Sequence, residues 1–482
     1  MVRTADPVTR SPYQWLGALL ALTALRLAVA GLAPLSGDEA YYWVWSRALA
    51  PGYLDHPPMV ALWIRAGTWL AGGGPIGVRL LGPLSALAGS LLLADAAKRL
   101  FPGRHAAVPA VALLNATLML GAGSIIMTPD TPLLFFWTAA LWSAVRAVQG
   151  KPIWWLACGA LAGGALLSKY TGGLLGLGLA AWLLGTQPGR DRLRQWQPWA
   201  GGALALALFL PVVAWNAAHG WISFVKQGGR EGDWSPALAG RYLAELAGSQ
   251  LGLATPVIFV LCIAGVWRAI QARREPGAGL LLAVTLVPAA VFVEHAFGGR
   301  VQGNWPAVLY PSACLAAAGY ARRGWRWGAG IGLAMALAVY AQAALAPLAL
   351  PRRLDPTLVQ MGGWPALARD VAAARRAAGA GFVAGAPYGL ASELAYRSNA
   401  RVAGVGTRWA LLPLLPLPER GVGLLVVTAR RREAPDPAVW AEAVPLGQLD
   451  RTRDGMVAES YRLYRVRLRS GIDARWLPRE DR

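Results

Sequence analysis

The sequence predicts an α-helical membrane protein with many transmembrane segments, followed by a small α/β domain at its C-terminal end. Three observations predict this fold class. First, 56% of the 482 residues are hydrophobic and only 15% are charged, with a mean hydropathy of +0.41, whereas a soluble domain carries about 25% charged residues. Second, apolar windows of about 20 residues, the length that spans a bilayer, recur as far as residue 349. Third, from residue 351 onward, prolines, charges and short apolar runs replace these windows.

The apolar windows predict about eleven membrane-spanning helices. Residues 57–72 are too short and too interrupted to cross, so we expect them to lie along the membrane interface. The aromatic-rich segment before them also suits the headgroup layer. The Gly-rich segment 153–186 is interrupted at residues 168–170, and we expect two short spans there. The expected spans are residues 13–35, 75–97, 106–127, 131–149, 153–168, 171–186, 199–218, 250–268, 278–297, 304–321 and 327–349.

The distribution of Lys and Arg residues predicts the orientation of the chain. With a cytoplasmic N-terminus, the inner loops carry more than twice as many of these residues as the outer loops, as the positive-inside rule requires. Eleven crossings then place residues 351–482 outside, as an α/β domain that follows a transmembrane domain of residues 1–350. The formal net charge of +21 does not indicate nucleic-acid binding, because the basic residues sit in short loops. No disulfide or metal site is expected from the cysteines, which all fall in apolar segments: Cys158, Cys262 and Cys314.

The C-terminal residues show the alternation of short strands and helices that is typical of an α/β domain. Residues 381–386 and 423–429 are apolar and bounded by glycine, which predicts strands. Residues 365–381 and 389–398 have helical patterns. We find no phosphate-binding loop, since "GVGTRW" has neither the spacing nor the context of a dinucleotide-binding turn.

The first outer loop, "SGDEAYYWVWSRALAPGYLDHPPM", concentrates acidic residues beside the hydrocarbon boundary. Asp38 would lie at the start of a short helix, where a negative charge is favoured. Glu39 and Tyr42 would share one face of that helix with Ser46, and two prolines stiffen the turn after Asp55 and His56. One alternative is an amphipathic interface helix with an ordinary polar cap. Carboxylates at this depth are costly unless they are solvated or used, so we interpret the loop as a candidate active site.

Two further outer turns contain charged residues. Asp130 lies in "MTPDTP", where turn formation alone is a sufficient explanation. Lys169 lies in "LLSKYTGG", between two short spans. An ammonium group there needs an anionic partner, for which a phosphate is a good candidate. Extension of the lysine to the membrane interface is the alternative.

The segment "GGRVQGNWP" combines groups that bind sugars and phosphates. Arg300 can bind a phosphate, and Gln302 and Asn304 can donate and accept hydrogen bonds beside the Trp305 ring. An ordinary polar loop is the alternative. A divalent metal site is possible but not expected, because the spacing of the candidate histidines predicts none: His56, His219 and His295.

The order of these motifs resembles the family 39 membrane glycosyltransferases of the GT-C class, relatives of the dolichyl-phosphate-mannose protein mannosyltransferases. The similarity covers roughly residues 10–350 and is closest to the bacterial branch that transfers aminoarabinose or galacturonic acid to lipid A. The matching segments are "GDEAYYWVWS" with "DHPPM", "TPDTPLLFFW", "GGALLSKYTGGLL", "WNAAHGWISFVKQ" and "NWPAVLYPS".

The resemblance implies an inverting transfer of a sugar from a polyprenyl-phosphate donor to a lipid A or other envelope glycan acceptor. It implies Asp38 as the general base and Lys169 as a cation that holds the lipid phosphate, and Arg300 is our second candidate for that phosphate. Glu39 and Asp130 would orient hydroxyl groups of the sugar or acceptor. His56 stands where some aminoarabinose transferases have a lysine, so a phosphate contact there is not carried over. The remaining substrate-binding candidates are Tyr42, Asp55, Gln302 and Asn304.

The resemblance also implies the setting of the reaction. The protein would be a monomer in the bacterial inner membrane, with its C-terminal domain in the periplasm. It would need no cofactor, and its partners would be the donor, the acceptor and membrane lipids. The alternative is a transporter or flippase for a phosphoisoprenoid or another anionic substrate. A transporter should show related halves and charges near the midplane, and here only Arg26 and Asp95 lie deep in predicted spans.

Overall fold

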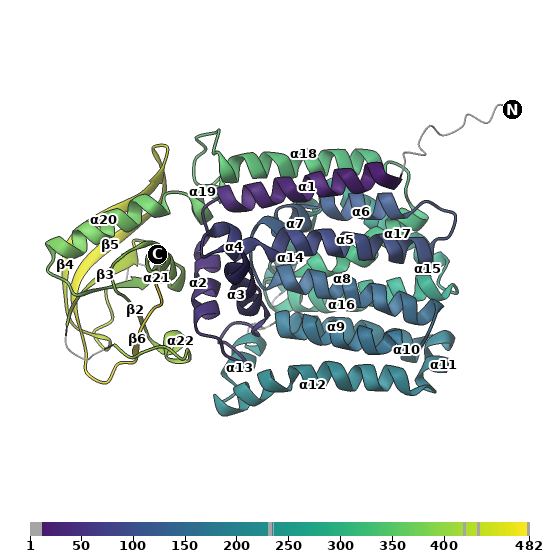
Figure 1. Ribbon diagram of the computed structural model, residues 1–482, viewed down its shortest axis with the longest axis horizontal. Helices are drawn as coiled ribbons and strands as arrows, with labels where there is room; N and C mark the ends of the chain where they lie inside the picture. The colour runs from purple at the N-terminus through teal and green to yellow at the C-terminus, as the bar shows by residue number, and fades with distance from the viewer. Residues whose placement is uncertain (1–11, 230–233, 235, 418–420, 431–433, 480–482) are drawn as a thin grey trace.

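The computed structural model describes residues 12–229, 234, 236–417, 421–430 and 434–479. A bundle of long helices fills one end of the molecule, and a β-sheet with its own helices fills the other (Figure 1). Three short helices lie between the two parts (Figure 1): α2 (Gly37–Arg47), α3 (Met59–Ala71) and α4 (Pro75–Arg79). Helix α2 confirms the short helix expected at Asp38, whereas α4 belongs to the expected span 75–97.

Long apolar helices make the bundle a multi-pass membrane domain. Among the described residues, six segments are long and apolar enough to cross a membrane, and two bent helix pairs raise the possible number to eight. The six contain α1 (Pro12–Leu32), α4 with α5 (Leu81–Leu100), α8 (Asp130–Gln149), α12 (Trp196–Ala218), α16 (Pro276–Gly298) and α18 (Trp325–Ala344). The helical membrane class is confirmed, while the number of eleven crossings stays a prediction.

Shorter helices complete the bundle. The first bent pair joins α6 (Ala107–Ala116) to α7 (Leu118–Gly121) and the 3-10 turn Gly123–Ile125 at an angle of 71°. Three other apolar helices are too short for the spanning criterion: α9 (Trp154–Ser168), α10 (Gly173–Gly185) and α17 (Tyr310–Tyr320). Two helices link their neighbours at opposite ends of α12: α11 (Gln187–Leu193) and α13 (Ile222–Gly228).

The expected span 250–268 is wrong in its boundary. The structure has two helices there, α14 (Pro236–Leu253) and α15 (Pro256–Gln271), which meet at an angle of 108°. Pro256 lacks an amide hydrogen and disfavours a helical conformation at the residue before it. Thr255 has a non-helical ψ of 146°, together with a positive φ of 68°. The helix must therefore break at this point, and part of the expected outer loop forms α14.

The sheet domain holds six strands in the order β4-β5-β3-β1-β2-β6. The central strands β3, β1 and β2 are parallel, and α21 (Tyr388–Arg397) connects β1 to β2. Strands β1 and β3 confirm the two expected strands, and α20 (Trp364–Ala377) and α21 confirm the two expected helices. The remaining helices are α19 (Pro356–Met361) and α22 (Thr407–Ala410). The strands are β1 (Phe382–Ala386), β2 (Val402–Val405), β3 (Val422–Thr428), β4 (Trp440–Arg453), β5 (Met456–Leu468) and β6 (Ala474–Trp476).

The sheet domain packs directly on the first loop. Helix α21 lies against α2, and their side chains share one apolar core. The two backbones approach so closely that a Cβ atom on Gly37 would lie 3.2 Å from the Cα atom of Gly389. This close contact brings the start of α2 next to the start of α21.

The basic loops of the bundle lie at the opposite end, near α11, α15 and α17 (Figure 1). Three arginines bind main-chain carbonyl groups there: Arg104 to Gly319, Arg268 to Tyr320 and Arg322 to Arg104. The two ends of the bundle therefore differ in chemistry: one carries arginine-rich loops and the other carries the first loop and the sheet domain.

Small residues allow the long helices to pack closely, as is common in membranes. Helix α9 crosses α12 at Gly159, where a Cβ atom would lie 2.0 Å from the carbonyl oxygen of Gly201. We therefore expect Gly159→Ala to force the helices apart and lower the free energy of unfolding by about 1–3 kcal/mol. Gly202→Ala is the matched control, because a Cβ atom there meets nothing within 4 Å. Thermal unfolding in detergent measures both, and equal midpoints for the two variants would contradict this packing.

Candidate active site

The start of α2 is fixed by its own side chains. Ser36 caps the helix, because its hydroxyl accepts a hydrogen bond from the Glu39 amide at 3.3 Å and the Glu39 carboxylate accepts one from the Ser36 amide at 3.0 Å. Asp38 lies in the first turn, where the helix dipole favours a carboxylate. The local sequence Ser-Gly-Asp-Glu thus explains both the start of the helix and the position of Asp38.

Glu39 holds this segment in the protein and does not face a substrate. Its carboxylate pairs with both sides of the Arg79 guanidinium, at 2.6 and 2.7 Å, and both side chains are fully buried. It also accepts a hydrogen bond from the Met127 amide at 2.9 Å. The structure therefore corrects the expectation that Glu39 orients substrate hydroxyl groups: burial and three sets of partners make it a structural residue.

Asp55 lies in a cluster of donors from three parts of the chain. Lys226 of α13 contacts one carboxylate oxygen at 2.5 Å, and Arg408 of α22 and the Tyr41 hydroxyl contact the other. Burial works against ionisation of Asp55, but the two cations outweigh it and lower its pKa. Asp55 is thus a carboxylate at neutral pH, flanked by two positive charges.

Asp38 keeps exposed surface and accepts a hydrogen bond from the Tyr388 hydroxyl at 2.8 Å. The surrounding protein removes part of its hydration, which raises its pKa, while the Tyr388 hydrogen bond acts in the opposite direction. An exposed carboxylate with a raised pKa is suited to act as a general base. Asp38 therefore becomes ionised at a higher pH than an ordinary aspartate, whose pKa is 3.8.

Aromatic rings line the space around these two carboxylates. The rings of Tyr41 and Tyr388 lie 4.5 Å apart, and the Arg408 guanidinium lies 4.4 Å from the Tyr388 centroid and 5.2 Å from the Tyr41 centroid. Tyr42 is buried beside them and contacts the His56 ring at 6.3 Å between centroids. The structure therefore gathers four of the expected site residues at α2, and Tyr42 and His56 form part of the wall of this site. The four are Asp38, Tyr42, Asp55 and His56.

A second cluster brings together three other predicted residues. The Lys169 ammonium contacts one oxygen of Asp130 at 2.7 Å, and the Asn304 amide donates to the other at 2.8 Å. Lys169 is only 7% exposed and lies 5.9 Å from the Trp305 ring centroid. Lys169 does have the anionic partner that the sequence required, but this partner is a carboxylate of the protein. Its expected role at a phosphate stays a prediction.

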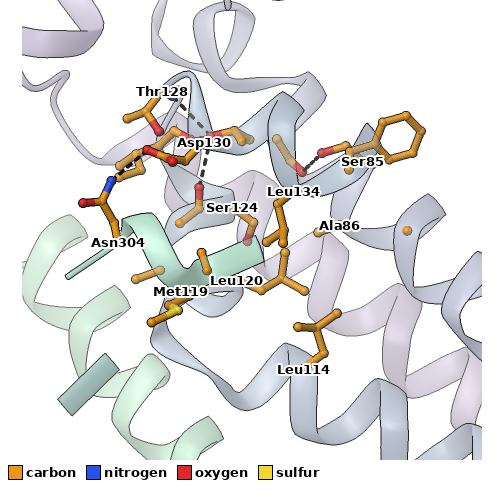
Figure 2. A pocket seen from close by; sticks show the side chains of 18 of the residues that line it. Ser85, Ala86, Leu114, Met119, Leu120, Ser124, Thr128, Asp130, Leu134 and Asn304 are labelled. Atoms are coloured by element: carbon orange, nitrogen blue, oxygen red, sulfur yellow. Dashed lines mark hydrogen bonds between the residues drawn. The ribbon is translucent and has the colours of Figure 1, made fainter. Parts of the chain in front are cut away.

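The second cluster lies at the rim of an apolar cavity of about 290 Å³. Figure 2 shows Thr128 and Asp130 at one end of the cavity and Leu114 at the other. Helices α5 and α8 and the turn before α8 form its walls. This volume is close to the lower limit of small-molecule pockets, about 300 Å³. The cavity can therefore hold a short apolar segment beneath a polar opening.

Two residues of the 298–306 loop do not join either cluster in the structure. Arg300 pairs with Glu245 of α14 at 2.8 Å, and its side chain is 73% exposed. Gln302 is exposed, and its main-chain carbonyl oxygen accepts a hydrogen bond from the Trp305 main-chain amide. Arg300 was expected as a second candidate cation for the lipid phosphate, and in the structure its partner is a carboxylate of the unexpected helix α14. Its role at a phosphate stays a prediction.

The histidines are also separated. His219 stacks on Trp215 at 4.3 Å, whereas His295 lies beside Trp305 at 5.5 Å. Within the part of the chain that the structure describes, no group of three or more His, Cys, Asp or Glu residues is placed to hold a metal ion. The possible metal site of His56, His219 and His295 therefore has no geometric support.

Sequence reasoning missed three residues of the first cluster. Lys226 was visible in the motif "WNAAHGWISFVKQ", but nothing in that motif indicated contact with Asp55. Tyr388 and Arg408 follow strands β1 and β2, whose carboxyl ends meet at one edge of the sheet because the strands are parallel. That edge is where ligands bind in open α/β sheets, and this rule could have indicated them.

The fold and the site define a class of protein: a multi-pass helical membrane protein whose acidic site lies between the bundle and a sheet domain. A family model described as dolichyl-phosphate-mannose-protein mannosyltransferase matches residues 55–215. The chain is 30% identical over 292 residues to the lipid A galacturonosyltransferase RgtD of Rhizobium johnstonii. That match covers 58% of this chain and 59% of RgtD, so it spans less than two thirds of the relative.

The fold is similar to that of a solved structure over almost the whole chain. The crystal structure of ArnT from Cupriavidus metallidurans bound to undecaprenyl phosphate has a TM-score of 0.64 at 18% identity, and covers 94% of this chain and 98% of ArnT. The apo structure of ArnT has a TM-score of 0.62 with the same coverage. These findings confirm the resemblance to the family 39 membrane glycosyltransferases and the GT-C type of fold.

The buried pair of Glu39 and Arg79 leads to a stability prediction. Glu39→Gln leaves the guanidinium buried without a counter-charge, which costs about 3–5 kcal/mol for such pairs. We expect a clearly lower unfolding temperature in detergent. Glu442→Gln is the matched control, since this residue is 43% exposed in its pairs with Arg465 and Arg467 and exposed pairs contribute about 0–1 kcal/mol. Equal stability of Glu39→Gln and the wild type would contradict the assignment.

Proposed function

We propose that this protein is an inverting glycosyltransferase that moves a sugar from a polyprenyl-phosphate donor to a lipid A or related envelope glycan. The observation that carries the proposal is the exposed Asp38 carboxylate, which lies in one aromatic-lined cluster with the cations around Asp55. The 30% identity to a lipid A galacturonosyltransferase and the fold shared with ArnT support this choice of donor and acceptor class.

The proposed reaction needs a base on one side of the anomeric carbon and cations on the other. The ionised Asp38 accepts the proton of the acceptor hydroxyl as its oxygen attacks the anomeric carbon. The bond from that carbon to the phosphate oxygen breaks, the configuration inverts, and the polyprenyl phosphate leaves with the bonding electron pair. Preorganised positive charges that hold the leaving phosphate would supply much of the rate enhancement.

Lys226 and Arg408 are the cations that we assign to the leaving phosphate. They share the single carboxylate of Asp55, so this trio has an excess of positive charge. Lys169 is fully paired with Asp130 and nearly buried, and we assign the Asp130 cluster to the sugar or acceptor hydroxyl groups instead. The two clusters are linked through the main chain. Glu39, next to Asp38, accepts a hydrogen bond from the amide of Met127, which lies three residues before Asp130.

The apolar cavity beneath Asp130 is a candidate for the part of a lipid nearest the headgroup. It is too small for a whole polyprenyl chain, whose remainder would stay in the bilayer. Its walls are formed largely by apolar side chains and its rim by Asp130 and Asn304 (Figure 2). This arrangement supports a lipid substrate whose polar head reaches the site while its tail stays dry.

We also propose the orientation of the protein in a bacterial inner membrane. The arginine-rich loops would face the cytoplasm, and the first loop and the sheet domain would face the periplasm (Figure 1). Exposed tryptophans near both ends of the bundle support an embedded position, because tryptophan favours the two interfaces. They are Trp196, Trp199, Trp267 and Trp327 near the arginine-rich loops, and Trp69 and Trp221 near the first loop.

The proposal predicts that Asp38→Asn abolishes transfer. Loss of a general base lowers a rate by about 10²–10⁴-fold. Purified full-length protein is incubated with a polyprenyl-phosphate sugar and lipid A, and the glycosylated product is quantified by mass spectrometry. Asp370→Asn, on the exposed surface of α20, is the matched control and should retain the wild-type rate.

Two results would contradict the proposed function in different ways. Transfer by Asp38→Asn at the wild-type rate would exclude Asp38 as the base. Wild-type protein that moves a phosphoisoprenoid across vesicles without forming a product would be a transporter or flippase. Envelope lipids from cells with and without the protein would then show no mass difference that corresponds to a sugar.

A further inference from the structure

Two side chains of the sheet domain reach the carboxylates of the first loop. Tyr388 opens α21, two residues after β1 ends, and Arg408 lies in α22, three residues after β2 ends. Because β1 and β2 are parallel neighbours, both side chains start from one edge of the sheet. That edge faces α2, where the backbones of Gly37 and Gly389 are in contact.

The contacts of these two residues are specific. The Tyr388 hydroxyl donates to Asp38 at 2.8 Å. Arg408 contacts Asp55 and donates to the Tyr41 hydroxyl at 2.8 Å through the same nitrogen. Its guanidinium also lies against the rings of Tyr41 and Tyr388. Arg408 therefore contacts both Asp55 and Tyr388, the tyrosine that binds Asp38. Both residues lie outside the segment 55–215 that the family model matches.

We propose that the sheet domain completes the transfer site through two side chains: Tyr388 positions the Asp38 carboxylate, and Arg408 both positions Asp55 and contacts the donor phosphate. This inference rests on the proposed function. Tyr388 fixes the rotamer of the Asp38 carboxylate and leaves its second oxygen to meet the acceptor hydroxyl. Arg408 fixes Asp55 and Tyr41 together and so sets the wall on which the sugar and its phosphate would bind.

The groups around Asp38 determine its pKa. Tyr42 and Glu39 belong to the same helix, Asp55 comes from the turn before α3, and Tyr388 and Arg408 come from the sheet domain. The hydrogen bond from Tyr388 and the charge of Arg408 favour the ionised carboxylate, while burial and the two neighbouring carboxylates disfavour it. Loss of the Tyr388 hydroxyl should therefore raise the pKa of Asp38.

Tyr388→Phe gives the sharpest test, because it removes one hydroxyl and retains the ring. A base must be ionised to act, so the rate of transfer falls at low pH. The acidic limb of the pH–rate profile therefore follows the pKa of Asp38. We expect this limb to move to higher pH by about one unit, which is a tenfold loss at a fixed pH on the limb. The rate should recover at higher pH. Tyr464→Phe, on β5 of the same sheet, is the matched control and should leave the limb unchanged.

Arg408→Gln and Arg408→Lys test the second residue. We expect kcat/KM for the donor to fall by about tenfold or more in Arg408→Gln, as for loss of one charged partner in a buried site. Arg408→Lys should recover part of it, because an ammonium group can still contact Asp55 and Tyr41. Arg401→Gln is the matched control, since Arg401 is exposed and lies 5.2 Å from the Trp476 ring on the far strand.

The outcomes separate the inference from the proposed function. An unshifted acidic limb in Tyr388→Phe, together with wild-type kcat/KM in Arg408→Gln, would overturn the inference and leave the transferase activity intact. Absence of transfer by the wild-type protein would overturn the proposed function and the inference with it. If Arg408→Gln does not fold in detergent, the pH profile of the conservative Tyr388→Phe variant still decides.

Discussion

The ion cluster around Asp55 is the interaction on which the rest of the site depends. One carboxylate joins the turn before α3 to α13 through Lys226 and to the sheet domain through Arg408, across 171 and 353 residues of sequence. The Asp55 side chain is 13% exposed, against 30% for Lys226 and 21% for Arg408. A partly buried carboxylate without these partners would be costly. The cluster therefore fixes where the three segments meet, and its excess positive charge is available to an anionic headgroup.

The bundle supports this cluster through a second, fully buried pair. Arg79 binds Glu39 and also the carbonyl oxygens of Ala30 and Ala33 at the end of α1, at 3.0 and 2.6 Å. This network ties the end of the first span to the start of α2. Asp38 is the neighbour of Glu39, so its position is set by a fully buried pair. The carboxylate that we propose as the general base is thus held by the bundle on one side and by the sheet domain on the other.

Local patterns in the sequence predicted the helices and the two central strands, but not the contacts between distant segments. The first-loop acids and the pairing need of Lys169 were visible because charges beside apolar spans are costly. The partner of Lys169 could not be predicted from the sequence, since Asp130 lies 39 residues away. Glu39 looked like its neighbour Asp38, and only the fold buries it against Arg79. Helix α14 and its Glu245, which pairs with Arg300, come from a segment that was expected for the most part as an outer loop. Strand β4 was not predicted because most of its side chains are exposed and buried and exposed residues do not alternate along it.

The central claim is that a donor phosphate binds beside Asp38, at the junction of the bundle and the sheet domain. The most direct measurement is a cryo-electron microscopy structure of the full chain in lipid nanodiscs with polyprenyl phosphate. We expect phosphate density in contact with Lys226 and Arg408, and the Asp38 carboxylate facing the space where the sugar would lie. Phosphate density at the opposite end, among Arg104, Arg268 and Arg322, would contradict a donor site at this junction.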